Sequence, residues 1–309
     1  MQAWTTLKLL EWTTDFFEKK GVPNSRLDAE LLLAHCLGCA RIDLYTQYNK
    51  PVQLKELDRF RPLVERRATR EPLQYIVGEA EFYGHRIKVT PDVLIPRPET
   101  ELLVELTLEL LAAGGASTVW TVRVPDAARQ LRSDRTRQEI LDIGTGSGCI
   151  AIALAKHLDT IHVTATERSA PALAVAAENV RAHELVDRIT LLEADLLPSD
   201  VPQAFDVVVS NPPYIARAEL DGLQPEVSQF EPRFALDGGP DGLDHYRRLA
   251  TSLPKVLAPG GTFVGEIGDT QAAQLREIFV AQEWCTDITI KQDLAGKDRI
   301  LIAQSRPLR

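Results

Sequence analysis

The sequence predicts an α/β protein with a doubly wound, mostly parallel sheet of seven strands, a small helical N-terminal domain and a linking β-hairpin. Three observations lead to this fold class. From residue 139 onward, short apolar runs alternate with helical patterns. A glycine-rich turn, GTGSG at 144–148, joins the first apolar run to the first of these helices. Before residue 74 the apolar spacing is mainly helical.

The first 73 residues are expected to form a small helical domain. Residues 3–20 have apolar side chains at helical spacing, and Ser25 is a candidate cap for a second helix. A third helix is expected over 53–69, interrupted by Pro62. This domain is locally basic, which fits a solvated helix face or a docking surface for a ribosomal or tRNA-mimicking partner; the arginines are Arg59, Arg61, Arg66, Arg67 and Arg70.

Residues 74–138 are expected to link the two domains. Alternation of apolar and polar residues around Gly84-His85 predicts a β-hairpin over 74–95. A helix over 102–111 follows, with Pro98 near its first turn. Residues 114–138 are poorly patterned and are interpreted as an exposed insertion, with a short strand over 118–124.

Residues 139–309 are expected to form the α/β domain. Apolar runs predict strands over 140–143, 161–166, 189–192, 205–210 and 261–266, with a closing pair at 286–292 and 299–304. Helices are expected over 149–157, 171–182, 243–257 and 270–282. Strand–helix repetition of this kind implies right-handed crossovers and a parallel sheet.

Composition limits the function classes. Four cysteines in 309 residues indicate a reducing compartment, and no apolar run is long enough to span a bilayer. No secretory signal is apparent, so a cytoplasmic protein without a membrane partner is expected. A monomer is expected as a separate prediction. A net charge of −9 disfavours a whole-surface nucleic-acid binder, so stable nucleic-acid binding is not expected.

A metal site is not expected. Cys36 and Cys39 form a CxxC beside His35, but no second pair stands at metal-ligand spacing. A redox CxxC would open a helix after a strand, whereas this one ends a helical pattern. Structural thiols are the favoured interpretation.

The glycine turn is a candidate cofactor site. Its G-x-G-x-G spacing is not the dinucleotide fingerprint, because position 149 is Cys. Glycines allow close approach of a ligand, and the helix N-terminus that follows favours an anionic group. Glu167 ends the second strand, where an acid can accept hydrogen bonds from a ribose diol, and Asp195 ends the third, near an adenine position. Each acid alone is equally typical of a solvated loop.

The fourth strand ends in Asn211-Pro212-Pro213-Tyr214. Two prolines cannot continue a sheet, so they make a stiff turn. The Asn211 side-chain oxygen and the Pro212 carbonyl can accept the two hydrogens of an NH2 group, and Tyr214 can form one wall of a planar slot. The alternative is an ordinary turn, because Asn and Pro are common turn residues.

Topology brings the two candidate sites together. In a sheet of order 3-2-1-4-5, the first and fourth strands are neighbours at the switch point, where ligands bind beyond the carboxyl ends. The glycine turn and the Asn-Pro-Pro-Tyr turn are therefore expected to face one crevice.

The motifs DIGTGSGCIAIALA and NPPY resemble those of class I S-adenosylmethionine-dependent methyltransferases, which are Rossmann-like. With FYGHRIKVTPDVLIPRPETELLVE and FEPRFALDGGPDGLDHYRRL, nearly the whole chain resembles the release-factor glutamine methyltransferases, the HemK/PrmC family. This resemblance implies methylation of the side-chain amide of the glutamine in the Gly-Gly-Gln loop of peptide chain release factors, in translation termination. It also implies that residues 1–73 recognise the substrate and that residues 139–309 are the catalytic domain that binds S-adenosylmethionine. It assigns Asn211, Pro212, Pro213 and Tyr214 to the glutamine, and assigns to S-adenosyl-L-methionine the residues Gly144, Thr145, Gly146, Ser147, Gly148, Glu167, Asp195, Leu196 and Asn211.

Three departures from the family pattern stand out. Glu167 replaces a more usual Asp, Leu196 stands where some members carry a larger ring, and the 114–138 segment is longer than the usual connector. Arg97 and Glu99 fit either a domain-linking salt bridge or ordering of the pocket, and residues 237–241 either a lid or a loop.

Other functions stay open. Glutamine methylation of a ribosomal protein uses the same NPPY chemistry. Amino methylation of DNA or RNA is disfavoured by the negative net charge. A non-catalytic scaffold is disfavoured because it would not need the acceptors for an amide NH2 group that Asn211 and Pro212 offer.

Overall fold

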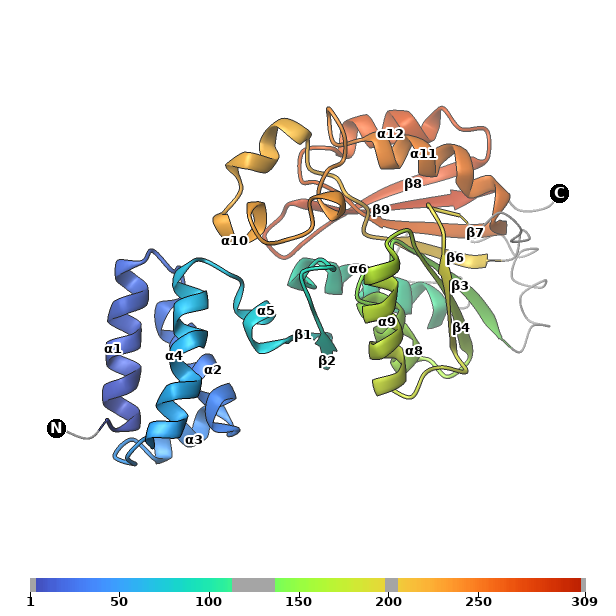
Figure 1. Cartoon of the computed structure of the whole chain (residues 1–309). Helices are drawn as coiled ribbons and strands as arrows, with labels where there is room; N and C mark the ends of the chain where they lie inside the picture. The colour runs from blue at the N-terminus through green and yellow to red at the C-terminus, as the bar shows by residue number, and fades with distance from the viewer. Residues whose placement is uncertain (1–3, 113–136, 198–204, 307–309) are drawn as a thin grey trace. The chain divides into compact units, whose positions relative to one another are not determined.

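A computed structural model describes residues 4–112, 137–197 and 205–306 (Figure 1). The chain divides into two compact units. The helical unit contains Met1–Glu79 and also Leu223–Glu231, and the sheet unit contains Ala80–Gly222 and Pro232–Arg309. Most of the predicted insertion over 114–138, with its short strand over 118–124, lies outside the described residues. The three-part division at 73 and 138 stays a prediction.

The helical unit packs three longer helices around an apolar core. Its helices are α1 (Thr6–Lys19), α2 (Ser25–Leu37), α3 (Arg41–Thr46), α4 (Leu54–Ala68) and α5 (Leu73–Val77). The core contains Leu10, Phe17 and Leu32, none of which is exposed. Removing such apolar surface from water is the main favourable contribution to folding.

Two local expectations in this unit are wrong. Helix α4 runs through Pro62 without interruption, because Pro62 lies on the exposed side and the opposite face buries Phe60 and Val64. Water can solvate the carbonyl that the proline leaves without a helical donor. Ser25 is the first helical residue, not the cap, and its hydroxyl donates to the Val22 carbonyl at 2.8 Å.

A short segment from the second half of the sequence completes the helical unit. It carries helix α10 (Pro225–Ser228), whose Glu226 accepts hydrogen bonds from Arg67 in the last turn of α4 and from Arg70 just beyond that helix. Arg67 contacts Glu226 at 3.0 Å and also Asp28 at 2.7 Å, and Arg70 contacts Glu226 at 2.6 Å. The Arg67 side chain is only 5% exposed, so these carboxylates compensate a buried charge.

The sheet unit opens with the linking hairpin. Strands β1 (Glu79–Phe82) and β2 (His85–Lys88) pair through a two-residue turn, Tyr83-Gly84. Both turn residues have positive φ, 50° and 75°, as a type I′ hairpin requires. Helix α6 (Pro98–Ala112) then starts at Pro98 itself, four residues earlier than predicted.

The seven-stranded sheet has the order β5-β4-β3-β6-β7-β9-β8. Its strands are β3 (Gln138–Ile143), β4 (Ile161–Glu167), β5 (Ile189–Glu193), β6 (Phe205–Ser210), β7 (Leu257–Glu266), β8 (Cys285–Gln292) and β9 (Asp298–Ser305). The first five strands in sequence pair in parallel, whereas β9 is antiparallel to both β7 and β8. The predicted fold class and the 3-2-1-4-5 order are confirmed.

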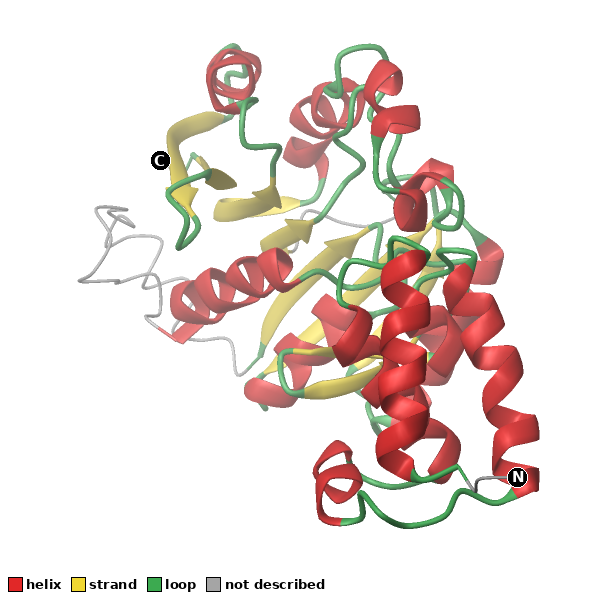
Figure 2. Cartoon of the chain, turned by 90° about the vertical axis from the view of Figure 1, so that its left-hand side faces the viewer, coloured by secondary structure: helices red, strands yellow, loops and turns green. Residues whose placement is uncertain are grey.

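Helices cover both faces of this sheet (Figure 2). Helices α6, α8 (Cys149–His157) and α9 (Ala170–Ala182) pack against its strands. Helices α11 (Asp244–Ser252) and α12 (Ala272–Val280) form a second apolar cluster with Leu141, Val208 and Phe263. Short 3₁₀ turns complete the connections, at Arg217–Gly222, Arg233–Ala235 and Leu253–Lys255.

Strand register aligns the carboxyl ends of β3, β4 and β6. Ile143 pairs with Thr166 of β4 on one side and with Ser210 of β6 on the other. The Ser210 hydroxyl also donates to the Ile143 carbonyl at 2.8 Å. The residues that follow, including Gly144 and Asn211, therefore begin at the same edge of the sheet.

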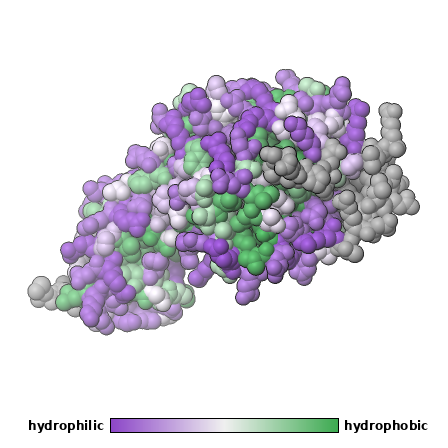
Figure 3. Space-filling view, turned by 45° about the vertical axis from the view of Figure 1, so that its right-hand side comes forward, coloured by the Kyte–Doolittle hydropathy of each residue, from purple (hydrophilic) through white to green (hydrophobic). Residues whose placement is uncertain are grey.

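The surface carries both hydrophilic and hydrophobic side chains. On the face drawn in Figure 3, hydrophilic side chains predominate and hydrophobic ones gather in smaller groups. Within the described residues, no helix combines the length and the apolar character needed to cross a bilayer.

Candidate active site

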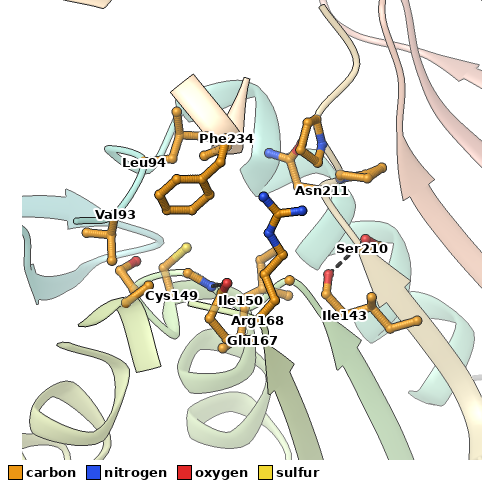
Figure 4. A pocket seen from close by; sticks show the side chains of 18 of the residues that line it. Val93, Leu94, Ile143, Cys149, Ile150, Glu167, Arg168, Ser210, Asn211 and Phe234 are labelled. Carbon is orange, nitrogen blue, oxygen red and sulfur yellow. Dashed lines mark hydrogen bonds between the residues drawn. The ribbon is translucent and has the colours of Figure 1, made fainter. Parts of the chain in front are cut away.

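A pocket lies at this carboxyl edge and collects most of the residues singled out from the sequence (Figure 4). Those that line it are Gly144, Thr145, Gly146, Ser147, Glu167, Asp195, Leu196, Asn211, Pro212 and Pro213. Gly148 and Tyr214 are not among the lining residues. The glycine turn and the Asn-Pro-Pro turn thus face one pocket within the sheet unit, as the strand order predicts.

Positive φ angles shape the glycine turn. Gly144 and Gly146 have φ of 72° and 54°, and a Cβ added at either would meet no protein atom within 4 Å. Both glycines line the pocket, so the open space beside them leaves room for a ligand against the backbone. Gly148 has another role: it precedes α8, and an added Cβ would lie 3.5 Å from the Ala176 Cβ of α9.

Asp142 supports the glycine turn from beneath. Its carboxylate accepts a hydrogen bond from the Thr145 hydroxyl at 2.6 Å, and the residue is fully buried. Burial raises the pKa of Asp142 to about 7, against which the hydrogen bond from Thr145 acts only in part. The glycine turn is therefore tied to a carboxyl group that sits well away from water.

Glu167 ends β4 beside the glycine turn. Its Oε2 accepts from the Gly146 amide at 3.1 Å and its Oε1 accepts from the Ser169 amide at 2.9 Å. Each carboxylate oxygen has a further lone pair, so the group can still accept from a ligand hydroxyl. The two backbone bonds fix its orientation in the pocket wall.

The third predicted cofactor element follows β5. Leu196 has a positive φ of 68°, which is unusual for a branched residue, and its carbonyl accepts from the Thr166 hydroxyl at 2.9 Å. Asp195 accepts from Arg248 at 2.7 Å, and this hydrogen bond lowers the pKa of Asp195 although burial opposes it. Strained non-glycine backbone of this kind is often found at functional sites.

The Asn-Pro-Pro-Tyr turn points in two directions. Asn211 is half-buried in the pocket wall, and its Nδ2 donates to the Thr100 hydroxyl at 3.0 Å. Tyr214 instead has its hydroxyl bonded to Glu266 Oε1 at 3.0 Å, and burial together with the Glu266 charge raises the pKa of Tyr214. Gln271 holds the same turn by donating to the Tyr214 carbonyl at 2.9 Å.

Several lining residues were missed by sequence reasoning. Arg168, Phe234 and His245 line the pocket, and the Arg168 guanidinium lies 5.7 Å from the Phe234 ring centroid. Figure 4 shows Phe234 and Arg168 reaching into the pocket from opposite sides. Thr100 and Arg97 also line it; both belong to the PRPETE stretch, whose roles the sequence left open.

The donor set suits a nucleoside cofactor carrying a charged amino-acid end. An open glycine cradle, an oriented carboxylate on Glu167 and an apolar wall including Ile150 are what such a ligand needs. Among the described residues, no group of three or more His, Cys, Asp or Glu side chains is placed to bind a metal ion.

Comparisons with known proteins agree with this site. Residues 8–78 match the PrmC N-terminal domain, and residues 127–224 match the methyltransferase small domain. The release factor glutamine methyltransferase of Geobacter sulfurreducens is 45% identical over 97% of this chain and 96% of its own. That of Rhodopirellula baltica is 43% identical over 97% and 96%.

A solved structure supports the fold alone. The hMettl16 catalytic domain, in complex with MAT2A 3′UTR hairpin 6, aligns with a TM-score of 0.53 and 21% identity, over 79% of this chain and 81% of that one. Identities of 45% and 43%, over nearly the full length of both chains, decide the family. The chain belongs to the release factor glutamine methyltransferases.

Proposed function

We propose that this protein transfers a methyl group from S-adenosyl-L-methionine to the side-chain amide nitrogen of the glutamine in the Gly-Gly-Gln motif of peptide chain release factors. The observation that carries the proposal is the shared pocket, which is lined both by Asn211 and by the glycine turn with its open space at Gly144 and Gly146. The relatives named above support the choice of substrate. This activity belongs to translation termination, and the cytoplasm is where its protein substrate would be met.

The cofactor supplies an electrophilic methyl group on a sulfonium centre. Gly144, Gly146 and the start of α8 would hold its amino-acid end, because the backbone there is open and the helix N-terminus favours a carboxylate. Glu167 would accept from the ribose hydroxyls, and Asp195 with Leu196 would border the adenine. Thr145 and Ser147 complete the turn, and Gly148 acts through helix packing.

The protein's own task is to make a poor nucleophile react. The lone pair of an amide nitrogen is delocalised into its carbonyl, so alignment and charge distribution matter more than a strong base. Asn211 Oδ1 and the Pro212 carbonyl would accept the two N–H hydrogens of the glutamine, which favours electron density on nitrogen as it attacks. The stiff prolines hold these acceptors in place, which is the preorganisation that lowers barriers.

For Tyr214 we propose a role other than one wall of a planar slot, because it is not among the residues that line the pocket. Its hydroxyl is held by Glu266, and the side chain packs against the apolar cluster of the sheet. We infer that Tyr214 anchors the turn and leaves the flat contact with the glutamine to the prolines and to Phe234, which line the pocket.

Methyl transfer to purified partners tests the proposal. Full-length protein is incubated with methyl-labelled S-adenosylmethionine and, separately, release factors, ribosomal proteins and DNA. Label in a release factor, and its loss when the Gly-Gly-Gln glutamine is changed to alanine, is expected. Label only in a ribosomal protein or in DNA would contradict the proposal.

A further inference from the structure

A hydrogen-bond relay runs from the side-chain nitrogen of Asn211 through buried Thr100 to Glu266 at the end of β7. Asn211 Nδ2 donates to Thr100 Oγ1 at 3.0 Å, and the Thr100 hydroxyl donates to Glu266 Oε2 at 2.6 Å. Thr100 and Glu266 are only 2% and 1% exposed, so neither can exchange these partners for water. The relay joins residues 111 and 166 positions apart in the sequence.

We propose that Thr100 and Glu266 are positioning residues that fix the orientation of the Asn211 amide, so that its oxygen and not its nitrogen faces the substrate. The proposal rests on the proposed function, in which Asn211 accepts a hydrogen bond from an amide NH2 group. It assigns a role to Thr100 of the PRPETE stretch, which the sequence left unexplained.

Which group donates and which accepts in the relay follows from the hydrogens that each side chain can donate. An ionised carboxylate only accepts, and Glu266 accepts from Thr100 on one oxygen and from Tyr214 on the other. Thr100 has one hydroxyl hydrogen, which it gives to Glu266, so it can only accept from Asn211. The Asn211 amide must therefore present Nδ2 to Thr100, and its Oδ1 is left as the acceptor for a ligand.

A reversed amide would harm the reaction. If Nδ2 faced the pocket, its hydrogens would oppose those of the substrate NH2 group, and one acceptor of the pair would be lost. Since the oxygen and nitrogen ends of an Asn amide have nearly the same shape, packing alone cannot decide which end faces the substrate. The Thr100 hydroxyl, whose hydrogen is directed to the Glu266 carboxylate, can decide it by accepting only from Nδ2.

The groups around Glu266 bear on its ionisation. Burial raises the pKa of Glu266, and the charge of Glu99 in the first turn of α6 acts in the same direction. The hydrogen bonds from Thr100 and Tyr214 and the charge of Arg299 on β9 oppose this, and the Tyr246 hydroxyl of α11 donates to the Glu266 carbonyl. A protonated Glu266 carries a hydrogen on one of its two oxygens and no longer accepts freely from both Thr100 and Tyr214, so acidification should weaken the orientation.

Matched variants separate orientation from packing. Thr100→Val keeps the shape and removes the hydroxyl, and Thr100→Ser keeps the hydroxyl. Thr107→Val is the control, because Thr107 is equally buried on α6 and donates only to the Leu103 carbonyl of its own helix. Glu266→Gln keeps the shape but can no longer accept on both sides.

Single-turnover methylation of a release factor is measured for each variant with saturating cofactor. We expect Thr100→Val and Glu266→Gln to lose about 10- to 100-fold, the scale known for residues that orient metal ligands. Thr100→Ser should restore most of the rate, and Thr107→Val should match wild type. The ratio of wild-type to Glu266→Gln rates should fall toward one as pH is lowered, since protonation then removes the same relay.

An NMR measurement decides the relay independently of activity. The chain has four asparagines, so selective ¹⁵N-asparagine labelling of the full-length protein gives four side-chain NH2 pairs. The pair absent from Asn211→Ala is assigned to Asn211; it should be hydrogen-bonded and exchange slowly in wild type and Thr100→Ser, and lose this in Thr100→Val.

An unchanged Asn211 pair in Thr100→Val, a wild-type rate in that variant, or an equal loss in Thr100→Ser would each overturn the relay. If wild type methylates no release factor, the proposed function fails, and the NMR result still decides the relay.

Discussion

Replacing Asn211 by alanine removes the acceptor on which the proposed chemistry depends. The variant loses one preorganised hydrogen-bond partner at the reacting nitrogen, and losses of this kind raise barriers by about 3–4 kcal/mol. That corresponds to a fall in turnover of roughly 10²- to 10³-fold. The loss to stability is smaller, about 1 kcal/mol, because only the bond to Thr100 is removed from the folded protein.

A single-turnover assay with saturating cofactor and release factor isolates this effect from binding. Cofactor affinity, measured by calorimetry, should change little, because the groups proposed to hold the cofactor stand at or just after the ends of β3, β4 and β5, whereas Asn211 follows β6. Asn24→Ala is a matched control, since Asn24 is exposed and makes no side-chain capping bond. An unchanged rate in Asn211→Ala would refute the role of Asn211 as a hydrogen-bond acceptor for the substrate amide.

Three further predictions concern the supports of the site and of the helical unit. Gly146→Ala should weaken cofactor binding at least 10-fold in calorimetry, because the new methyl group enters the pocket; unchanged affinity would contradict the cradle. Asp142 has its pKa raised to about 7, so the folded state binds more protons than the unfolded chain between about pH 4 and 7, and stability falls as pH rises. Asp142→Asn should reduce the change of the urea unfolding midpoint with pH. An unaltered dependence on pH would contradict the contribution assigned to Asp142. Glu226→Gln should destabilise the helical unit by about 1–3 kcal/mol near pH 7, seen as a lower Tm. The pKa of Glu226 is lowered, since the bonds from Arg70 and Arg67 outweigh burial, so the difference should shrink as pH falls through the folded pKa; a constant difference would contradict the ion pairs.

Features written in short, continuous stretches were accessible from the sequence. The apolar runs of β3 and β6 each end in a distinctive turn, and the parallel-sheet rule alone brings Gly144 and Asn211 to one edge. The fold class, the strand order and the family were therefore predictable. The residue roles at the cofactor and substrate positions stay predictions, although the pocket holds nearly all of these residues.

Features that depend on distant residues were not accessible. Thr100 and Glu266 are 166 positions apart, and no local pattern signals a hydroxyl that touches a strand end. The packing of Glu226 into the helical unit depends on arginines more than 150 positions away, which the sequence suggested only as a solvated face or a docking surface. Pro62 does not interrupt α4, because its side of the helix is exposed; helix propensity alone does not show which side of a helix faces water.

A structure of the full-length protein with S-adenosylhomocysteine and a Gly-Gly-Gln peptide tests the central claim most directly. We expect the glutamine amide nitrogen within about 3 Å of both Asn211 Oδ1 and the Pro212 carbonyl oxygen. The cofactor sulfur should lie on the side of this nitrogen that faces away from the two acceptors. A glutamine bound elsewhere, or an Asn211 side chain offering its nitrogen to the peptide, would contradict it.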